Sequence, residues 1–162
     1  MFIRFITTGG TIDKIYFDDM SRYEVGDSLV THILAEGLVT FDYELVSLFR
    51  KDSLEMTDAD RLAIRHYIEE DSAGHFIITH GTDTMADTAA ALQDIQDKRI
   101  VLTGALSPAR FKSTDAVFNL GMAVAAVQVV EPGVYIAMNG QVFPGGRVRK
   151  NRERNRFEST GG

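Results

Sequence analysis

The sequence predicts a three-layer α/β domain in which helices cover both faces of a mostly parallel sheet. Short apolar runs typical of buried strands alternate along the chain with segments of helical spacing. The connections between them are short, and such an alternation places successive strands parallel, with helices on both faces. The length of 162 residues, without an internal repeat or a linker, fits one domain over 1–162.

The first strand is expected over 2–7, where isoleucines alternate with Phe, Arg and Thr. Gly9 and Gly10 follow it, and glycine permits a positive φ and a close approach of the backbone to a ligand. The polar segment 13–27 is expected to form a hairpin or a mobile loop over the end of this strand. Its aromatic residues are candidates for a lid, although folding back onto the core is the commoner fate of such side chains. They are Tyr16, Phe17 and Tyr23.

The rest of the chain continues the alternation. A short helix begins near Val30 and is closed by Gly37, and a second helix begins at Thr57. Gly81 ends a buried apolar run, after which Met85, Ala89, Leu92 and Ile95 share one face of a helix expected over 83–95. The Asn139-Gly140 pair predicts a tight hairpin turn. The remaining strands are expected at 43–49, 76–78, 99–103, 134–138 and 141–143, and the last helix at 115–130.

The composition excludes several classes of site. The chain has no cysteine, which rules out disulfides and thiolate metal sites, and its four histidines show no metal-ligand spacing. No metal or cofactor is therefore expected. The net charge of −6 argues against nucleic-acid binding. No apolar run approaches the length of a membrane span and no signal-peptide pattern begins the chain, so a cytoplasmic protein is expected.

The charge is distributed unevenly along the chain. Residues 147–156 hold six of the 17 cations and one acid, which leaves 11 cations and 22 acids for the rest. This basic C-terminal segment, 146–162, is interpreted as a solvated tail that pairs with the acidic body or a neighbouring subunit. Nucleic-acid binding is the less favoured alternative, because Phe157 is the only aromatic residue interleaved with the cations.

Three polar clusters fall at the carboxyl ends of predicted strands. They are 8–11, Asp52-Ser53 and 81–83. Parallel strands end at one edge of a sheet, where α/β proteins bind ligands, so we expect the three clusters to converge. The alternative for Thr82 and Asp83 is a purely structural role as N-caps of the helix that follows.

These clusters are rich in threonine and lack Cys, obvious metal ligands and a candidate Ser–His–Asp set. A threonine hydroxyl attacks a carbonyl carbon only when a neighbouring base accepts its proton. The available bases are Asp13, Tyr23, Asp83 and a lysine such as Lys14, Lys112 or Lys150.

Two motifs carry a resemblance to a known family. Thr8-Gly9-Gly10-Thr11-Ile12 and His80-Gly81-Thr82-Asp83-Thr84-Met85, in this order, resemble the signatures of the bacterial-type L-asparaginases. The resemblance runs along the chain but covers only the family's N-terminal domain. It implies a flavodoxin-like fold and a short-chain form that lacks the smaller C-terminal domain.

The resemblance also implies roles for individual residues. The catalytic set would be Thr11 as nucleophile, Tyr23, Thr82, Asp83 and Lys150. Substrate would be bound by Gly10, Ser53, Thr82, Asp83 and Ala105, with Ser53 holding the α-carboxylate and Asp83 the α-ammonium. The implied reaction converts L-asparagine to L-aspartate and ammonia through an acyl-enzyme ester.

The sequence leaves the substrate and the assembly open. Leu54 and Glu55 follow Ser53 where many family members carry more polar pairs. Substrate contacts from a second domain must be absent or come from a neighbouring copy, so a homodimer or homotetramer is expected. L-glutamine is a second possible substrate, because one extra methylene changes binding by only ~1–3 kcal/mol. A related amidase and a catalytically inactive domain that binds amino acids or a partner are also compatible with the sequence.

Overall fold

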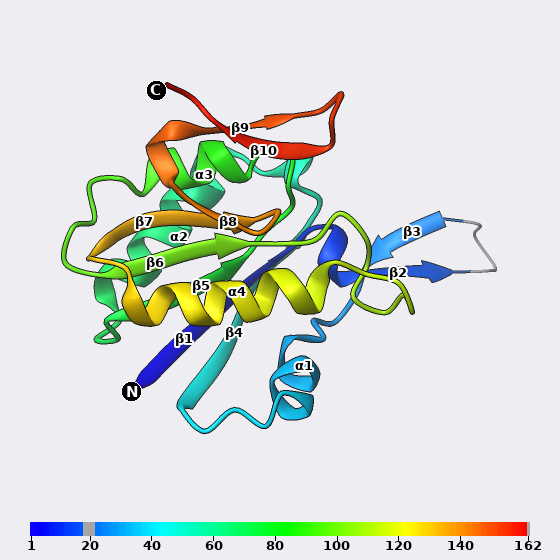
Figure 1. Cartoon of the computed structure of the whole chain (residues 1–162), viewed down its shortest axis with the longest axis horizontal. Helices are drawn as coiled ribbons and strands as arrows, with labels where there is room; N and C mark the ends of the chain where they lie inside the picture. Colours follow the sequence, from blue (N-terminus) through cyan, green and yellow to red (C-terminus); the bar gives the residue numbers. More distant parts are fainter. Residues whose placement is uncertain (18–21, 162) are drawn as a thin grey trace.

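The computed structural model describes residues 1–17 and 22–161, and within them the central sheet has six strands in the order β4-β1-β5-β6-β7-β8 (Figure 1). The first five strands in this order are parallel, and β8 runs antiparallel to β7. Their bounds are β1 Phe2–Gly9, β4 Asp42–Lys51, β5 His75–Thr79, β6 Arg99–Thr103, β7 Gly133–Met138 and β8 Gln141–Pro144. The predicted mostly parallel sheet is therefore confirmed.

Helices cover both faces of this sheet. On one face, α1 (Val30–Glu36) and α4 (Ala116–Val129) pack over one apolar cluster. On the other face, α2 (Asp58–Glu70) and α3 (Met85–Ala91) pack over a second apolar cluster. Successive side chains of a strand point to opposite faces, so Ile77 of β5 belongs to the first cluster while Phe76 and Ile78 belong to the second. The three-layer α/β fold predicted from the sequence is confirmed.

The strand order reverses direction next to β1. The chain goes from β1 to β4 on one side and then crosses to β5 on the other side of β1. This arrangement is the flavodoxin-like order, and ligands bind such sheets at the carboxyl ends of the two strands where the order reverses. The fold thus directs attention to the segments that follow β1 and β5.

In the described part of the chain, two hairpins lie outside the central sheet. Strands β2 (Lys14–Phe17) and β3 (Arg22–Val25) pair antiparallel and project beyond the carboxyl end of β1 (Figure 1). The hairpin alternative for segment 13–27 is therefore confirmed, and its residues 18–21 lie outside the described part of the chain. Strands β9 (Val148–Asn151) and β10 (Arg156–Ser159) form the second hairpin.

The basic C-terminal segment is not the solvated tail that its charge predicts. It folds as the β9–β10 hairpin, which buries Val148 and Phe157 against the cluster under α3. The Phe157 backbone N–H donates a 2.8 Å hydrogen bond to Asn139 Oδ1 in the turn after β7. Apolar residues at two positions of the segment outweigh its charge, because each finds a site in the core while the arginine side chains stay exposed.

The helix expected over 83–95 is shorter in the structure. Regular helix spans only Met85–Ala91, and the chain then continues in tight turns in which Leu92 N donates to Ala89 O and Ile95 N donates to Leu92 O. These turns keep Leu92 and Ile95 buried, so the apolar face predicted from the spacing is preserved. Among the described residues, no helix is both long enough and apolar enough to cross a membrane.

Candidate active site

The turn after β1 is held in a conformation that glycine favours. Gly9 and Gly10 have φ values of 101° and 86°, in the left-handed region. A Cβ atom on Gly10 would lie 2.5 Å from the Cα of Gly81, and the Gly10 N–H donates a 2.9 Å hydrogen bond to the carbonyl of Lys51. The turn after β1 therefore contacts the ends of both neighbouring strands.

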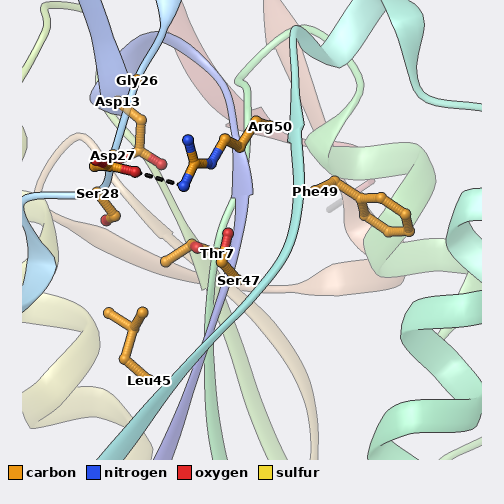
Figure 2. Close-up of a pocket in the computed structure, with 9 residues that line it drawn as sticks. All are labelled: Thr7, Asp13, Gly26, Asp27, Ser28, Leu45, Ser47, Phe49 and Arg50. Atoms are coloured by element: carbon orange, nitrogen blue, oxygen red, sulfur yellow. Dashed lines mark ion pairs between the residues drawn. The ribbon is translucent and has the colours of Figure 1, made fainter.

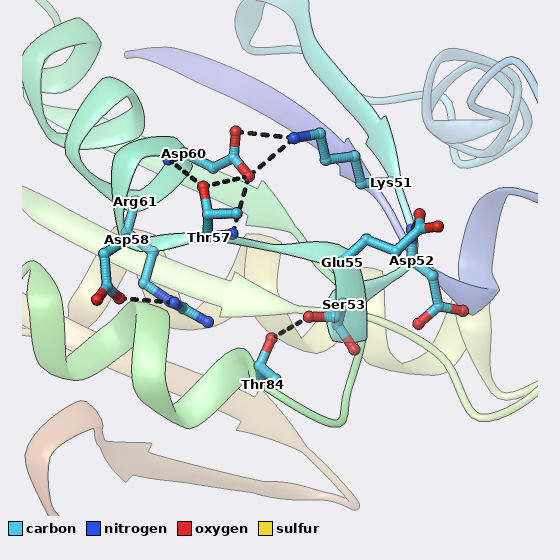
Figure 3. A network of polar contacts seen from close by, with 9 residues as sticks. All are labelled: Lys51, Asp52, Ser53, Glu55, Thr57, Asp58, Asp60, Arg61 and Thr84. Carbon is cyan, nitrogen blue, oxygen red and sulfur yellow. Dashed lines mark hydrogen bonds and ion pairs between the residues drawn. The ribbon is translucent and has the colours of Figure 1, made fainter.

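Gly81, which follows β5, packs closely against Ser53, which follows β4. A Cβ atom there would lie 2.5 Å from Ser53 Cβ and 2.7 Å from Ser53 Oγ. The Thr84 hydroxyl donates a 2.7 Å hydrogen bond to the Ser53 carbonyl (Figure 3). The three polar clusters, which lie far apart in the sequence, therefore converge at one edge of the sheet as the strand ends predict.

Ion pairs of Lys51 and Asp52 hold the loop that carries Ser53 in place. Lys51 Nζ donates to both carboxylate oxygens of Asp60, at 3.0 and 2.9 Å, and Asp60 Oδ2 also accepts from the backbone N–H and hydroxyl of Thr57 (Figure 3). These hydrogen bonds hold the pKa of Asp60 below its usual value, those from Thr57 most strongly. Asp52 caps the short turn Ser53–Glu55 and forms a 2.8 Å ion pair with Lys14.

Lys150 connects the β9–β10 hairpin to the segment after β5. Its Nζ lies 2.7 Å from Thr82 Oγ1 and 2.8 Å from Asp83 Oδ1. Thr82 is 6% exposed, and the Lys150 side chain is 12% exposed. Arg152 lies farther away, with Nε 3.8 Å from Asp83 Oδ1. The structure therefore brings Thr82, Asp83 and Lys150 into one polar cluster, which we call the lysine cluster.

A capping role does not account for Thr82 and Asp83. The N-cap position of α3 is Thr84, and its side chain makes no capping hydrogen bond. Thr82 and Asp83 precede this position and direct their side chains to Lys150 instead.

Thr11 and Tyr23 share a pocket of about 280 Å³ near the edge of the sheet that carries the lysine cluster. Thr11 begins the short 3-10 turn Thr11–Asp13, and Tyr23 comes from β3. The Tyr23 ring packs against Phe111 at a centroid distance of 6.1 Å and is half exposed. The pocket is lined by Thr11, Lys14, Tyr23, Leu106, Ser107, Pro108 and Phe111. Thr82, Asp83 and Lys150 are not among its lining residues, so the candidate catalytic residues form two adjacent groups.

Ala105, which precedes the pocket residue Leu106 in the chain, is 1% exposed and packs with Ile12 and Ala116. The backbone around it is held in place by side chains of α4 and its N-cap. Asn119 Nδ2 donates a 2.9 Å hydrogen bond to the Gly104 carbonyl, and the Asp115 carboxylate accepts from the backbone N–H groups of Leu106 and Ser107. The strand end after β6 therefore forms a fixed wall of the site. Lys112, in the same loop, is exposed.

His80 is a residue of this edge whose importance the sequence does not reveal. The side chain is fully buried, with Nδ1 2.7 Å from the Gly81 carbonyl and Nε2 2.8 Å from Thr88 Oγ1. The carbonyl can only accept, so Nδ1 carries the proton and Nε2 accepts from the Thr88 hydroxyl. Burial, assisted by the nearby Arg61 guanidinium, lowers the pKa of His80 to about 4. A neutral imidazole therefore holds the Gly81 peptide in place. The only sequence signal was its position beside Gly81.

Asp13 faces away from the Thr11 pocket. Its carboxyl borders a different cavity, of about 230 Å³, between β1, β4 and the segment after β3 (Figure 2). Asp13 is 3% exposed, and burial raises its pKa to about 6. Asp13 is one of the candidate bases for Thr11. The two residues belong to the same turn but line different cavities. Within 1–17 and 22–161, no three His, Asp or Glu side chains group together as metal ligands.

Comparison with known proteins identifies the family. The family model described as "Asparaginase, N-terminal" matches residues 2–160. The glutaminase-asparaginase of Acinetobacter glutaminasificans is 35% identical over 114 residues, which cover 67% of this chain and 31% of the relative. L-asparaginase 2 of Escherichia coli is 41% identical over 86 residues, which cover 49% of this chain and 24% of the relative.

A solved structure shares the fold over nearly the whole chain. The thermostable L-asparaginase from Thermococcus kodakarensis superposes with a TM-score of 0.85 and 28% identity, covering 98% of this chain and 51% of that one. The chain thus spans about half the length of this structure and less than a third of the two curated relatives. Because the family model extends over almost every residue, the chain belongs to the asparaginase family and corresponds to that family's N-terminal domain.

Proposed function

We propose that this domain hydrolyses the side-chain amide of L-asparagine to L-aspartate and ammonia, with Thr11 as the nucleophile. The observation that carries the proposal is the lysine cluster, because its hydrogen bonds join a threonine, an acid and a lysine at the edge of the sheet that also bears Thr11. Membership of the asparaginase family supports an amidohydrolase reaction.

In the first half of the proposed reaction, Thr11 Oγ attacks the amide carbon. A C–O bond forms, the C–N bond breaks, and ammonia leaves after the leaving nitrogen takes up a proton. Tyr23 borders the same pocket, and we assign it the role of accepting the Thr11 proton. In the second half, water attacks the resulting ester, which releases L-aspartate and restores the Thr11 hydroxyl.

Lys150 acts in this scheme as an ammonium group. It donates to Thr82 Oγ1 and to the Asp83 carboxylate. A hydroxyl that accepts from an ammonium group becomes a better hydrogen-bond donor through its own proton. We therefore assign Thr82 the role of a polarised hydroxyl that stabilises charge developing on the substrate or passes a proton.

Substrate recognition is assigned to the segments around these groups. In the proposal, Ser53 holds the α-carboxylate, Asp83 receives the α-ammonium, and the backbone at Gly10 and Ala105 lies beside the scissile amide. The tight contact between Gly10, Gly81 and Ser53 supports this assignment, because it leaves these backbone groups little freedom to move. A preorganised set of polar groups is what stabilises a developing oxyanion best.

L-glutamine is a second candidate substrate. A relative named glutaminase-asparaginase is 35% identical over two thirds of this chain, and one extra methylene changes recognition by only ~1–3 kcal/mol. The side chains around Thr11 leave a pocket of about 280 Å³, which is large enough for either amide. The cytoplasmic location expected from the sequence stays a prediction.

The test is ammonia release from L-asparagine and L-glutamine, measured without added metal or cofactor on a sample of known mass. The proposal expects release from asparagine at a higher kcat/KM than from glutamine. Binding of L-aspartate is measured in parallel by calorimetry. Aspartate binding without ammonia release from either amide would replace the proposal with an inactive amino-acid-binding domain.

A further inference from the structure

The cavity that Asp13 borders contains a buried carboxyl group, one oxygen of which lacks a hydrogen-bond partner. Asp13 is 3% exposed, and its Oδ1 atom has no hydrogen-bond partner among the described residues. Figure 2 shows the carboxyl at the edge of the cavity, which measures about 230 Å³. An unpaired acceptor in a buried position destabilises the fold unless a ligand or water satisfies it.

The two guanidinium groups that act on this carboxyl both contact Asp27 instead of pairing with Asp13. Arg50, from β4, forms an ion pair with Asp27 at 2.5 Å, and Arg110, from the loop after β6, donates its Nη2 to the Asp27 carbonyl at 2.9 Å. Both guanidinium groups lower the Asp13 pKa only weakly compared with the rise that burial causes. Within the described part of the chain, no ion pair is formed by Asp13 itself.

Apart from the Asp27–Arg50 ion pair, the other polar side chains that line the cavity carry hydroxyl groups. The hydroxyl of Ser28 lies beside the Asp13 carboxyl, and the hydroxyl-bearing residues Thr7 and Ser47 also line the cavity. Because Arg50 is paired with Asp27, the buried carboxylate and the hydroxyl oxygens can accept hydrogen bonds from a small monovalent cation that donates several of them. Divalent metals require more carboxylate ligands than the single buried one present here.

We propose that this cavity binds a protonated amine, whose N–H groups donate to Asp13 Oδ1 and to the neighbouring hydroxyl oxygens. The ligand neutralises the carboxylate and supplies the donor that Oδ1 lacks. Two sources have the required chemistry: the free ammonium ion and the α-ammonium group of an amino acid. The cavity volume admits either.

Occupation of the cavity would connect the elements that carry the candidate catalytic residues. Its walls come from the end of β1, from the turn that holds Thr11, from β4 and from the segment that follows the Tyr23-bearing hairpin. A bound amine therefore fastens that hairpin to the sheet. If the domain releases ammonia, the product itself can occupy this site; that link rests on the proposed function, whereas the binding does not.

The test is thermal unfolding at pH 8, where Asp13 is ionised. Ammonium chloride represents the free ion, L-alanine represents the α-ammonium group, and choline chloride at equal ionic strength supplies a cation without N–H donors. We expect a saturable rise in Tm of about 2 °C or more in ammonium chloride, in L-alanine, or in both, relative to choline chloride. The solution that raises Tm shows whether the site binds the free ammonium ion or the α-ammonium group of an amino acid. The rise should disappear at pH 4, where Asp13 is protonated.

Matched variants separate binding at Asp13 from a general charge effect. Asp13→Asn keeps the shape of the side chain and should abolish the rise, whereas Asp97→Asn, which removes one exposed acid near the amino end of β6, should retain it. Thr7→Val should weaken the response without abolishing it. Equal Tm values in all three solutions, or an undiminished rise in Asp13→Asn, would overturn the proposal. Because no step requires turnover, an inactive protein that shows the rise would reject only the proposed function.

Discussion

At the scale of single residues, Asp13 and His80 are buried titratable groups whose pKa values move in opposite directions. Burial raises the pKa of Asp13 from 3.8 to about 6 and lowers that of His80 from 6.5 to about 4. As pH rises through this window, the folded state retains the Asp13 proton that the unfolded chain has lost, so stability falls. For His80 the unfolded chain holds the extra proton, so stability rises with pH. The two contributions therefore partly cancel in the wild-type protein.

Asp13→Asn should remove the loss of stability that the Asp13 carboxyl causes as pH rises. A difference of about 2 pKa units corresponds to roughly 3 kcal/mol, so the variant should gain about that much free energy of unfolding relative to the wild type between pH 4 and pH 7. Urea unfolding at a series of pH values, in buffers free of ammonium and amines, measures the difference. A difference that does not change with pH would show that Asp13 has an ordinary pKa in the folded protein.

Thr11 should be indispensable for turnover and dispensable for folding. Thr11→Ala should lower kcat for ammonia release by at least ~10³-fold if a covalent ester forms, because the nucleophile is then absent. Thr40→Ala, at an exposed threonine just before β4, is the matched control and should keep full activity. Turnover by Thr11→Ala close to that of the control would exclude Thr11 as the nucleophile.

Thr82→Val tests the lysine cluster separately. The variant keeps the shape of the side chain and removes the oxygen to which Lys150 donates. We expect kcat to fall by roughly 10²-fold or more while the far-ultraviolet circular dichroism spectrum is unchanged. Retention of wild-type kcat with this spectrum would remove Thr82 from the mechanism.

At the scale of secondary-structure elements, the β9–β10 hairpin places Lys150. The hairpin is anchored by Phe157, which is 2% exposed, and by the hydrogen bond from its N–H to Asn139. Four of its arginines remain at least half exposed, and three of them share the single acid Glu158. Exposed ion pairs of this kind stabilise little, so the apolar contact decides where the hairpin lies.

Phe157→Ala should therefore loosen the hairpin and reduce activity together. Removing a buried phenylalanine costs about 3–5 kcal/mol in a protein core, which corresponds to a fall in Tm of the order of 10 °C for a chain of this size. We expect kcat measured well below Tm to drop by about 10-fold or more, because Lys150 is no longer held at Thr82. Val129→Ala, at an 80% exposed position at the end of α4, is the control and should change neither value. If Phe157→Ala lowers Tm but leaves kcat unchanged, Phe157 is not needed to hold Lys150 at Thr82.

At the scale of the whole molecule, an apolar groove runs between α1 and α4 on the surface. It measures about 340 Å³ and is bordered by Ile33, Val117 and Val124. Val117 is 52% exposed and the neighbouring Phe118 is 64% exposed. Helices with apolar residues around much of their circumference are usually covered on more than one side.

We expect the protein to form a homodimer or homotetramer in solution through this groove. Light scattering at micromolar concentration should give a multiple of 18.0 kDa, and Val117→Arg should shift the mass toward one chain. Glu36→Gln, at the rim of the same groove, is the control and should leave the mass unchanged. A mass of one chain, with activity that does not fall on dilution, would exclude a site completed by a neighbouring copy.

The fold was predictable because its signals are local. The apolar run at 76–78, the glycines after β1 and the capping residue Thr57 each determine the structure of the residues beside them. Asn139 and Gly140 both adopt positive φ in the turn between β7 and β8, as the hairpin signal requires. The convergence of the polar clusters also followed from the sequence, because parallel strands end at a common edge.

Other features depend on contacts between distant segments. Lys150 and Thr82 are 68 residues apart, and the burial of Val148 and Phe157 together with the hydrogen bond to Asn139 brings the basic segment back to the strand edge. The same applies to His80, whose neutral state depends on Thr88 and on the burial of the ring. It applies equally to the Asp13 cavity, whose walls come from β1, β4 and the segments around the β2–β3 hairpin.

The sequence by itself therefore determined the layers of the fold, the order of its elements and the residue types available at the edge of the sheet. The tertiary structure decided which of those residues meet, which carry charge, and that Thr82 and Asp83 face a lysine and do not cap a helix. The physical reason is that backbone preferences and apolar spacing act between near neighbours. Desolvation and hydrogen-bond geometry depend on every segment that folding brings together.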